Sequence, residues 1–266
     1  MRKMIFVFLS LFLFGNVFAQ MDEKFYHPDR EWIPVDIPNY SEMMLIVQQD
    51  TIYSAWIRPE QPAKATILYF HGNGGNISKW MKHVKPMIDA GFQVFMPDYR
   101  GYGKSTGKPT HVNIAHDARA FFDTLMRQPG VSDLPLIVYG ASLGTQVAVH
   151  LTRHNNKKIS ALVLDGMMAS FTDIALATSP VEHHPYIRQL VTSPYSAIED
   201  IGHVAHVNLL VIHSEEDAVP ISGARSVYEK AVCPKDFWLY EGKHLEAGVL
   251  YPDRMIARLN RLVKQE

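Results

Sequence analysis

The sequence predicts a single α/β domain, built on a mostly parallel β-sheet with helices on both of its faces. Short apolar runs rich in β-branched residues recur along the chain, and segments with helical apolar spacing lie between them. Continuous apolar runs are typical of strands covered on both faces, and their alternation with helices is typical of a parallel sheet. A chain of 266 residues, of which 47% are hydrophobic and 20% charged, can bury one large core.

Residues 1–19 predict a cleavable signal peptide. Arg2 and Lys3 precede an apolar run from Met4 to Phe14, and Ala19 is a small residue at the expected cleavage position. The apolar run is too short to cross a membrane, which takes about 20 apolar residues. We therefore expect cleavage after Ala19 and a secreted or periplasmic protein with no stable membrane span. An uncleaved N-terminal anchor is the alternative.

Residues 20–64 predict an N-terminal segment that belongs to the same domain as the rest of the chain. From Met43 to Ile57 the pattern indicates a β-hairpin, with Gln48-Gln49-Asp50 as its turn. Residues 65–266 are expected to form the main part of the domain. The strands expected there are Thr66 to Phe70, Phe92 to Met96, Leu136 to Tyr139, Ala161 to Leu164, Leu209 to Ile212 and Phe237 to Tyr240.

Helical spacing is clearest in two segments that follow strands. Apolar residues recur at intervals of three and four from Ile114 to Met126, and the same spacing is present from Met255 to Val263. Residues 166–208 form the longest stretch without a clear strand and contain several prolines. Long connections of this kind often cover functional sites, so this stretch is a candidate cap; a surface excursion with no role is the alternative.

A serine flanked by glycines follows the strand that ends at Tyr139. The segment Gly140–Gly144 reads Gly-Ala-Ser-Leu-Gly, and a segment with helical apolar spacing begins directly after it. This strand-turn-helix context is the one in which a G-x-S-x-G serine acts as a nucleophile. The glycines are expected because side chains at Gly140 and Gly144 would collide with the adjoining strand and helix. Ser142 is therefore the candidate nucleophile.

A serine hydroxyl needs a base to remove its proton, and in this arrangement an acid and then a histidine follow the serine along the chain. The strand from Leu209 to Ile212 leads into His213–Pro220, which contains three acidic residues. The next strand ends at Tyr240 and is followed by a loop with His244. Loops after parallel strands share one edge of the sheet, so both partners are expected beside Ser142.

Attack on a carbonyl also requires hydrogen-bond donors for the negative charge that develops on the carbonyl oxygen. One donor is expected to be the backbone N–H of Leu143, at the start of the helix behind Ser142. The second is expected from the loop after the strand Thr66 to Phe70, where residues 71–76 read His-Gly-Asn-Gly-Gly-Asn. Small residues in this loop let its backbone approach the substrate closely.

In their order along the chain, these motifs resemble the α/β-hydrolase superfamily, near its serine-aminopeptidase-like and palmitoyl-thioesterase-like members. The resemblance extends from about Ala65 to the C-terminus and includes Asp98–Ser105, which reads Asp-Tyr-Arg-Gly-Tyr-Gly-Lys-Ser. It implies an α/β-hydrolase fold with a catalytic domain at residues 65–266 and a short cap region at about 166–208.

The resemblance also implies which residues perform the chemistry. Matched to the family's motifs, Ser142, Asp217 and His244 form a catalytic triad, and the N–H groups of Asn73 and Leu143 bind the oxyanion. Such a serine hydrolase cleaves a carboxylic ester, thioester or amide through an acyl-enzyme, with no cofactor and no metal ion. The expected substrate is a small molecule with an acyl or peptide bond, and short acyl esters are the first choice.

The segment around the acid departs from the family's pattern in two ways. The family usually has His-Gly after the acid-bearing strand, where this chain has His213–Ser214, and it commonly has two residues between the acid and Val-Pro. Counting back from Val219–Pro220 places Glu216 in the acid position, whereas counting forward from the strand places Asp217 there. We favour Asp217, because the register from the strand end is expected to be tighter. Glu216 stays open as the alternative.

Composition and single motifs disfavour several other functions. Lysine plus arginine (26) nearly balance aspartate plus glutamate (27), so no basic face for nucleic acid is expected. A dinucleotide-binding loop would need glycine at Ile77, and a P-loop would need glycine at Asp98. His183 and His184 lack a third metal ligand at helical spacing, and the single cysteine, Cys233, has no partner within the chain.

Two further questions stay open at this level. Met167, Met168 and Phe171 follow the strand that ends at Leu164, and they either line an acyl pocket or pack beneath the cap. The chain is predicted to be a secreted serine hydrolase, and the alternative from another class is a catalytically silent α/β-hydrolase domain that only binds a ligand. Substrate identity and oligomeric state are not specified by these motifs.

Overall fold

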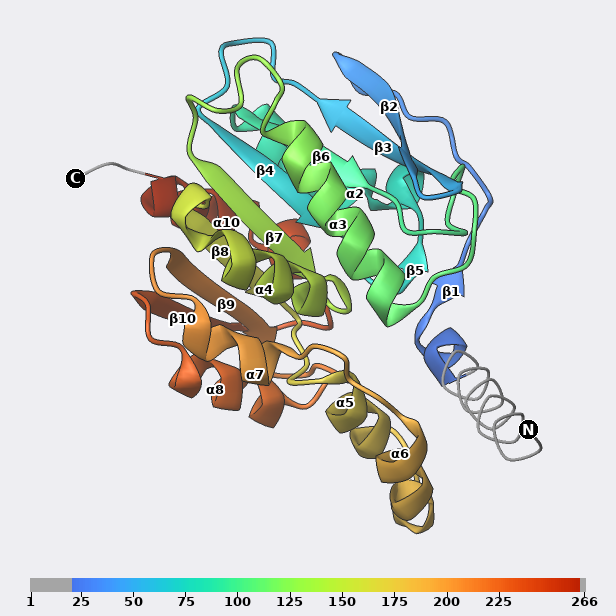
Figure 1. The fold of residues 1–266 in the computed structure, drawn as a ribbon. Coiled ribbons are helices and arrows are strands. Elements are labelled where there is room, and N and C mark those ends of the chain that lie inside the picture. The colour runs from blue at the N-terminus through green and yellow to red at the C-terminus, as the bar shows by residue number, and fades with distance from the viewer. Residues whose placement is uncertain (1–20, 264–266) are drawn as a thin grey trace.

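The computed structural model describes residues 21–263 and contains one large sheet between two layers of helices (Figure 1). The strands of the sheet are β2 Tyr40–Val47, β3 Asp50–Ile57, β4 Ala65–Phe70, β6 Phe92–Pro97, β7 Leu136–Ala141, β8 Ala161–Asp165, β9 Asn208–Ser214 and β10 Lys235–Tyr240. Their order across the sheet is β10-β9-β8-β7-β4-β6-β3-β2. The pairs from β10 to β6 are parallel, whereas β6 with β3 and β3 with β2 are antiparallel.

This arrangement confirms the mostly parallel sheet that the apolar runs predict. Each expected strand is present and extends beyond one or both of its expected ends; in β8, β9 and β10 the added residues are polar residues that still join the ladder. Ser214 pairs with Tyr240, and Asp165 pairs with Ala141. The parallel strands all point the same way, so the loops after β4, β7, β8, β9 and β10 meet at one edge of the sheet.

The predicted hairpin is present, but its predicted turn is wrong by one residue. Asp50 pairs with Val47 and begins β3, which leaves a two-residue turn of Gln48 and Gln49. Gln48 has a φ of 58°, in the left-handed region that tight hairpin turns require. The Arg100 guanidinium, 2.5 Å from Asp50 Oδ2, holds the aspartate at the start of the strand. A contact with so distant a residue leaves no local signal in the sequence.

Helices cover both faces of the sheet, as the alternating pattern predicts. The layer in front in Figure 1 packs its apolar side chains into one buried cluster and includes α3 His111–Leu125, α4 Gly144–Asn155 and α8 Ile221–Lys230. The layer behind the sheet packs into a second buried cluster and includes α2 Ile77–Asp89, α9 Ala247–Leu250 and α10 Pro252–Val263.

Residues 166–208, the candidate cap, connect β8 to β9 through three short helices. These are α5 Phe171–Ala177, α6 His184–Leu190 and α7 Ala197–Asp200. In Figure 1, α5 and α6 project from the molecule, whereas α7 packs against α4. Because the stretch begins at the carboxyl end of β8, it stands beside the edge of the sheet at which β7 leads into Ser142.

The N-terminal segment reaches the loop that follows β4. The short strands β1 His27–Pro28 and β5 Gly74–Gly75 pair in parallel. The predicted signal peptide, residues 1–19, lies outside the described residues. Among residues 21–263, the structure contains no helix of sufficient length and hydrophobicity to cross a membrane.

Candidate active site

Ser142 lies at the sharp turn between β7 and α4. Its φ is 51°, in the left-handed region that costs a non-glycine residue about 1–2 kcal/mol. The neighbouring glycines permit the turn. A Cβ at Gly140 would lie 2.5 Å from the Gly144 carbonyl oxygen, and a Cβ at Gly144 would collide with the Phe70 carbonyl oxygen. The turn therefore depends on both glycines.

His244 and Asp217 form a hydrogen-bonded pair on the loops after β10 and β9. The imidazole Nδ1 lies 2.7 Å from Asp217 Oδ1 and 2.8 Å from Oδ2. The Val219 N–H donates to Oδ1 over 2.8 Å. Burial by itself raises the pKa of Asp217, but the hydrogen bonds from His244 and Val219 outweigh it and lower this pKa below its usual value. The ionised carboxylate holds Nδ1 and leaves Nε2 of the imidazole for another partner.

Of the two acids considered for this position, Asp217 contacts His244 and Glu216 does not. The Asp217 side chain is only 1% exposed, whereas Glu216 is exposed. The backbone N–H of Glu216 donates to the Ser214 hydroxyl oxygen over 3.0 Å. Adjacent side chains in this turn thus point to opposite sides, and only one of them faces the histidine.

The two loops that carry Asp217 and His244 are also joined to each other. The Ser214 hydroxyl donates to the Gly242 carbonyl oxygen. The Glu215 N–H donates over 3.1 Å to the carbonyl oxygen of Tyr240, the last residue of β10. Sequence reasoning did not single out Ser214 as a functional residue. Its signal was present, because Ser214 is the residue at which this chain departs from the family's His-Gly pattern.

Gly166 brings the histidine loop close to the serine loop. The Ser142 N–H donates to the Asp165 carbonyl oxygen over 2.8 Å, and Gly166 follows directly. A Cβ at Gly166 would lie 2.6 Å from Cε1 of His244 and 2.9 Å from its Nδ1. The backbone at 165–166 therefore touches both loops. Within residues 21–263, no hydrogen bond joins the Ser142 hydroxyl to His244, a contact that is often long in ligand-free sites.

The loop after β4 lies against Ser142. A Cβ at Gly72 would lie 3.4 Å from Cβ of Ser142. The Asn73 carbonyl oxygen accepts from the Tyr102 hydroxyl over 2.7 Å, which fixes the loop. Among the described residues, the backbone N–H groups of Asn73 and Leu143 donate to no other group. Neither N–H group is therefore committed to a partner within residues 21–263.

Residues 98–105 hold the loop after β4 in place through contacts to His71. Asp98 Oδ1 lies 3.1 Å from Nε2 of His71, and the Tyr99 hydroxyl donates to the His71 carbonyl oxygen over 2.6 Å. Nδ1 of His71 lies 2.7 Å from the Gly72 carbonyl oxygen. Burial raises the pKa of Asp98, and its hydrogen bonds partly offset this effect. These contacts give His71 and Asp98 a structural part in positioning the loop.

A further carboxyl group, Asp165, is buried at the end of β8 beside this site. The Tyr139 hydroxyl donates to its Oδ2 over 2.7 Å, and its Oδ1 has no hydrogen-bond partner among the described residues. Burial raises the pKa of Asp165 to about 7, although the Tyr139 hydrogen bond and the nearby His244 act in the opposite direction. Sequence reasoning missed Asp165, because acidic residues at strand ends usually reach solvent.

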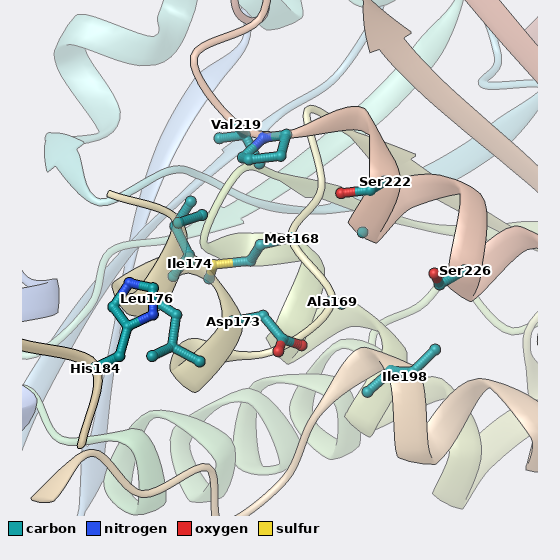
Figure 2. A pocket seen from close by; sticks show the side chains of 13 residues that line it. Met168, Ala169, Asp173, Ile174, Leu176, His184, Ile198, Val219, Ser222 and Ser226 are labelled. Atoms are coloured by element: carbon teal, nitrogen blue, oxygen red, sulfur yellow. The ribbon is translucent and has the colours of Figure 1, made fainter. Parts of the chain in front are cut away.

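A cavity of about 440 Å³, which we call the α5–α8 cavity, lies between α5, α7 and α8 (Figure 2). Met168 lines it, whereas Met167 and Phe171 are fully buried in the core. Packing therefore accounts for Met167 and Phe171, and only Met168 of the three faces a cavity.

Other residues singled out in the sequence make no hydrogen bond to Ser142, Asp217 or His244 in the described part of the chain. Within residues 21–263, no group of three or more His, Cys, Asp or Glu side chains is arranged to hold a metal ion. His183 is exposed, and Nε2 of His184 lies 3.3 Å from the Ser179 carbonyl oxygen. Cys233 is buried, and this burial raises the pKa of its thiol.

Comparisons with known proteins agree on the fold. A protein-family model described as alpha/beta hydrolase fold matches residues 65–183. Among solved structures, the esterase Pf2001 of Pyrococcus furiosus superimposes with a TM-score of 0.69 at 18% identity, covering 89% of this chain and 97% of that one. At this level of identity the likeness shows a shared fold, and it confirms the predicted α/β-hydrolase fold.

Two relatives are similar in sequence. The uncharacterized protein YfhR of Escherichia coli (strain K12) is 29% identical over 255 residues, which cover 91% of this chain and 85% of that protein. Protein bem46 of Schizosaccharomyces pombe is 32% identical over 165 residues, which cover 61% of this chain and 55% of that protein.

Proposed function

We propose that this chain, which matches the alpha/beta hydrolase fold model over residues 65–183, is a serine hydrolase that cleaves carboxylic esters through an acyl-enzyme on Ser142. The observation that carries the proposal is the His244–Asp217 pair, at 2.7 Å, on loops beside a serine with a φ of 51°. The Pyrococcus furiosus neighbour is named as an esterase, which favours esters as the first substrate class. Thioesters and amides would react by the same route.

In the proposed first step, Oγ of Ser142 forms a bond to the carbonyl carbon while Nε2 of His244 takes the hydroxyl proton. The Asp217 carboxylate stabilises the imidazolium that results. The backbone N–H groups of Asn73 and Leu143 hydrogen-bond to the oxyanion, where loss of one donor typically costs about 100- to 1,000-fold in rate. The bond to the alkoxy group then breaks, and this leaving group takes the proton from the imidazolium.

In the second step, water replaces the alcohol. His244 removes a proton from the water molecule as its oxygen attacks the acyl carbon, and the same N–H groups bind the second oxyanion. The bond between the acyl carbon and Oγ of Ser142 breaks, and His244 returns the proton to the serine. The products are the carboxylic acid and the free enzyme.

A fluorophosphonate probe, which reacts with activated serines, tests the proposal. We expect the wild type to be labelled and to hydrolyse p-nitrophenyl acetate, and we expect Ser142→Ala to lose both properties, with hydrolysis falling by about 10³-fold or more. Ser132→Ala, in an exposed loop, is the control and should keep both. Labelling that persists in Ser142→Ala contradicts the assignment, and an unlabelled wild type would favour a domain that only binds.

We also propose that the protein is secreted or periplasmic, because Arg2, Lys3 and the apolar run that follows have the pattern of a signal peptide. Expression of the full chain in a bacterial host with a secretory pathway tests this, with N-terminal sequencing of the product. We expect the mature chain to begin at Gln20. A product that retains residues 1–19 would contradict the proposal.

A further inference from the structure

The loop after β4 is held from outside by a segment near the start of the described chain. Residues 26–31, which we call the N-terminal strap, lie alongside this loop where β1 pairs with β5 (Figure 1). The His27 N–H donates to the Asn73 carbonyl oxygen over 3.1 Å and to the Tyr102 hydroxyl oxygen over 2.9 Å. That hydroxyl donates in turn to the same carbonyl oxygen. The Asn73 carbonyl oxygen therefore has two donors, and one of them belongs to the strap.

The strap is fixed at both of its ends. Tyr26 is buried in the core, and its hydroxyl oxygen lies 2.7 Å from Nδ1 of His111 at the start of α3. At the other end, the Asn76 side-chain amide donates to the carbonyl oxygens of Asp29 over 3.0 Å and Glu31 over 2.8 Å. Asn76 is fully buried and caps the N-terminus of α2. The strap therefore connects the starts of two helices and holds a defined position between them.

The loop needs outside support because its own residues restrict its backbone only weakly. Three of the four residues at 72–75 are glycines, which lose more conformational freedom on ordering than any other residue. A Cβ at Gly74 would meet no atom within 4 Å, so close packing does not fix the backbone there. The Gly74 carbonyl oxygen accepts instead from Nε1 of Trp80 over 2.8 Å. Hydrogen bonds to its carbonyl groups thus hold the loop in one conformation.

The Asn73 N–H, the proposed oxyanion donor, depends on how the Asn73 carbonyl group is held. Only the two rotatable backbone bonds of one residue separate these groups, since the flanking peptide groups are planar. The N–H shares its peptide group with the Gly72 carbonyl oxygen, which lies 2.7 Å from Nδ1 of His71. The peptide groups on both sides of Asn73 therefore set the direction of its N–H, and the strap holds the second of them.

We propose that the N-terminal strap is a positioning element of the active site, and that the His27 N–H directs the Asn73 N–H toward the oxyanion by holding the Asn73 carbonyl group. The proposal rests on the proposed function of Ser142. His27 acts through its backbone, since the residue is otherwise exposed. The rate of acyl transfer thereby depends on a segment that lies about 50 residues before the loop in the chain and touches no reacting atom.

A proline at position 27 removes the N–H without otherwise preventing the strap from forming. Tyr26 has a φ of −117° and a ψ of 130°, in the extended region that a following proline requires. His27→Pro therefore removes the donor to Asn73. His27→Ala removes only the exposed side chain and keeps the N–H, so it is the matched control.

The two variants are compared on p-nitrophenyl acetate and on its thionoester, in which sulfur replaces the carbonyl oxygen. Sulfur is a weak hydrogen-bond acceptor, so the ratio of kcat/KM for the ester to that for the thionoester measures the action of the oxyanion donors. We expect His27→Pro to lower kcat for the ester by about 10- to 100-fold with KM within about twofold, because it misdirects one donor without removing it. We expect it to lower the ratio by about fivefold or more.

His27→Ala should keep the wild-type kcat and the wild-type ratio. A substitution that only destabilises the protein lowers both activities equally and leaves the ratio unchanged. A wild-type ratio in His27→Pro would therefore overturn the proposal.

Hydrogen exchange of the wild type tests the same coupling without a substitution, should His27→Pro fail to fold. Oγ of Ser142 adds to the carbonyl carbon of a trifluoromethyl ketone, its proton passes to His244, and the ketone oxygen becomes an oxyanion. Because coupling between two sites is reciprocal, we expect the strap amides to exchange at least about threefold more slowly with the ketone bound. Amides at Ser132 and Asp133, before β7 at the opposite edge of the sheet, should be unaffected. Unchanged exchange in the strap would contradict the proposal.

Activity of the wild type distinguishes failure of this inference from failure of the proposed function. A wild type that hydrolyses the ester, with no change of ratio in His27→Pro and no slower exchange in the strap, overturns only the role of the strap. A wild type that neither hydrolyses the ester nor binds the ketone overturns the hydrolase proposal, and the role of the strap with it.

Discussion

Asp217 and Glu216 are neighbours in the chain with opposite surroundings. The Asp217 carboxylate is buried against His244, and Glu216 faces solvent. If Asp217 orients the histidine, Asp217→Asn should lower kcat by about 10⁴-fold, because an amide in its place favours the wrong imidazole tautomer. Glu216→Gln should stay within about twofold of the wild type, since it removes an exposed charge only. Hydrolysis of p-nitrophenyl acetate checks both variants, and the reverse pattern would make Glu216 the acid.

Asp165 makes the stability of the fold depend on pH. Burial raises its pKa to about 7 in the folded protein, well above the value of about 3.9 expected in the unfolded chain. The folded state therefore binds this proton more tightly than the unfolded state. The stability linked to Asp165 is fully present below about pH 4 and is lost as the pH rises through about 7.

Asp165→Asn removes this dependence, because the amide does not ionise and its oxygen can still accept from the Tyr139 hydroxyl. We expect the variant to gain stability relative to the wild type between about pH 5 and pH 8, by up to about 1.4 kcal/mol per pH unit. Urea unfolding at the two pH values measures the difference. A difference between the two proteins that does not change with pH would show that Asp165 does not titrate in this range.

At the scale of the elements, the loop after β8 lies between the serine turn and the histidine loop and contacts both. Gly166 and Gly130 have similar positive φ values, 61° and 77°, but a Cβ at Gly166 would meet the His244 ring and a Cβ at Gly130 would meet open space. We expect Gly166→Ala to lower kcat/KM by about 100-fold, because displacing the imidazole by about 1 Å has this effect. Gly130→Ala carries the same backbone strain and should keep its activity. Equal activities in these two variants would show that the contact does not matter.

At the scale of the whole molecule, Arg100 joins the N-terminal hairpin to the helical layer. Its side chain is 4% exposed, and the guanidinium lies 2.8 Å from Asp117 Oδ1 on α3 and 2.5 Å from Asp50 Oδ2 on β3. Because Arg100→Met leaves both carboxylates without their partner, we expect it to lower the free energy of unfolding by about 3–5 kcal/mol. Lys85→Met, which breaks the exposed pair with Asp89, should cost less than about 1 kcal/mol.

Urea unfolding of these two variants also tests whether residues 20–64 belong to the domain. The hairpin shares the sheet with the parallel strands through the β3–β6 pair. We therefore expect one cooperative transition that moves as a whole in Arg100→Met. An earlier, separate transition of the hairpin would contradict the single domain.

The sequence alone predicted the elements of the sheet and the candidate nucleophile. Both faces of a strand such as Phe92 to Met96 are covered by helices. Consecutive residues in such a strand are therefore apolar, and this pattern can be recognised in the sequence. The strained turn at Ser142 could also be predicted from the sequence. The turn requires residues without a side chain at Gly140 and Gly144, which are near neighbours of Ser142 in the chain. The predicted turn was wrong at Asp50, which pairs with Val47 in the hairpin and contacts Arg100, a residue distant in the chain.

What the sequence by itself determined is therefore the α/β architecture, the strand-turn-helix around Ser142 and the order in which an acid and a histidine follow it. Only the tertiary structure decided that Asp217 rather than Glu216 contacts His244, that Asp165 is buried, and that a cavity opens between α5 and α8. The physical reason is distance along the chain. Periodic burial and local sterics act between near neighbours, whereas the direction of a loop side chain, the burial of a carboxyl group and the shape of a cavity depend on segments that meet only when the chain folds.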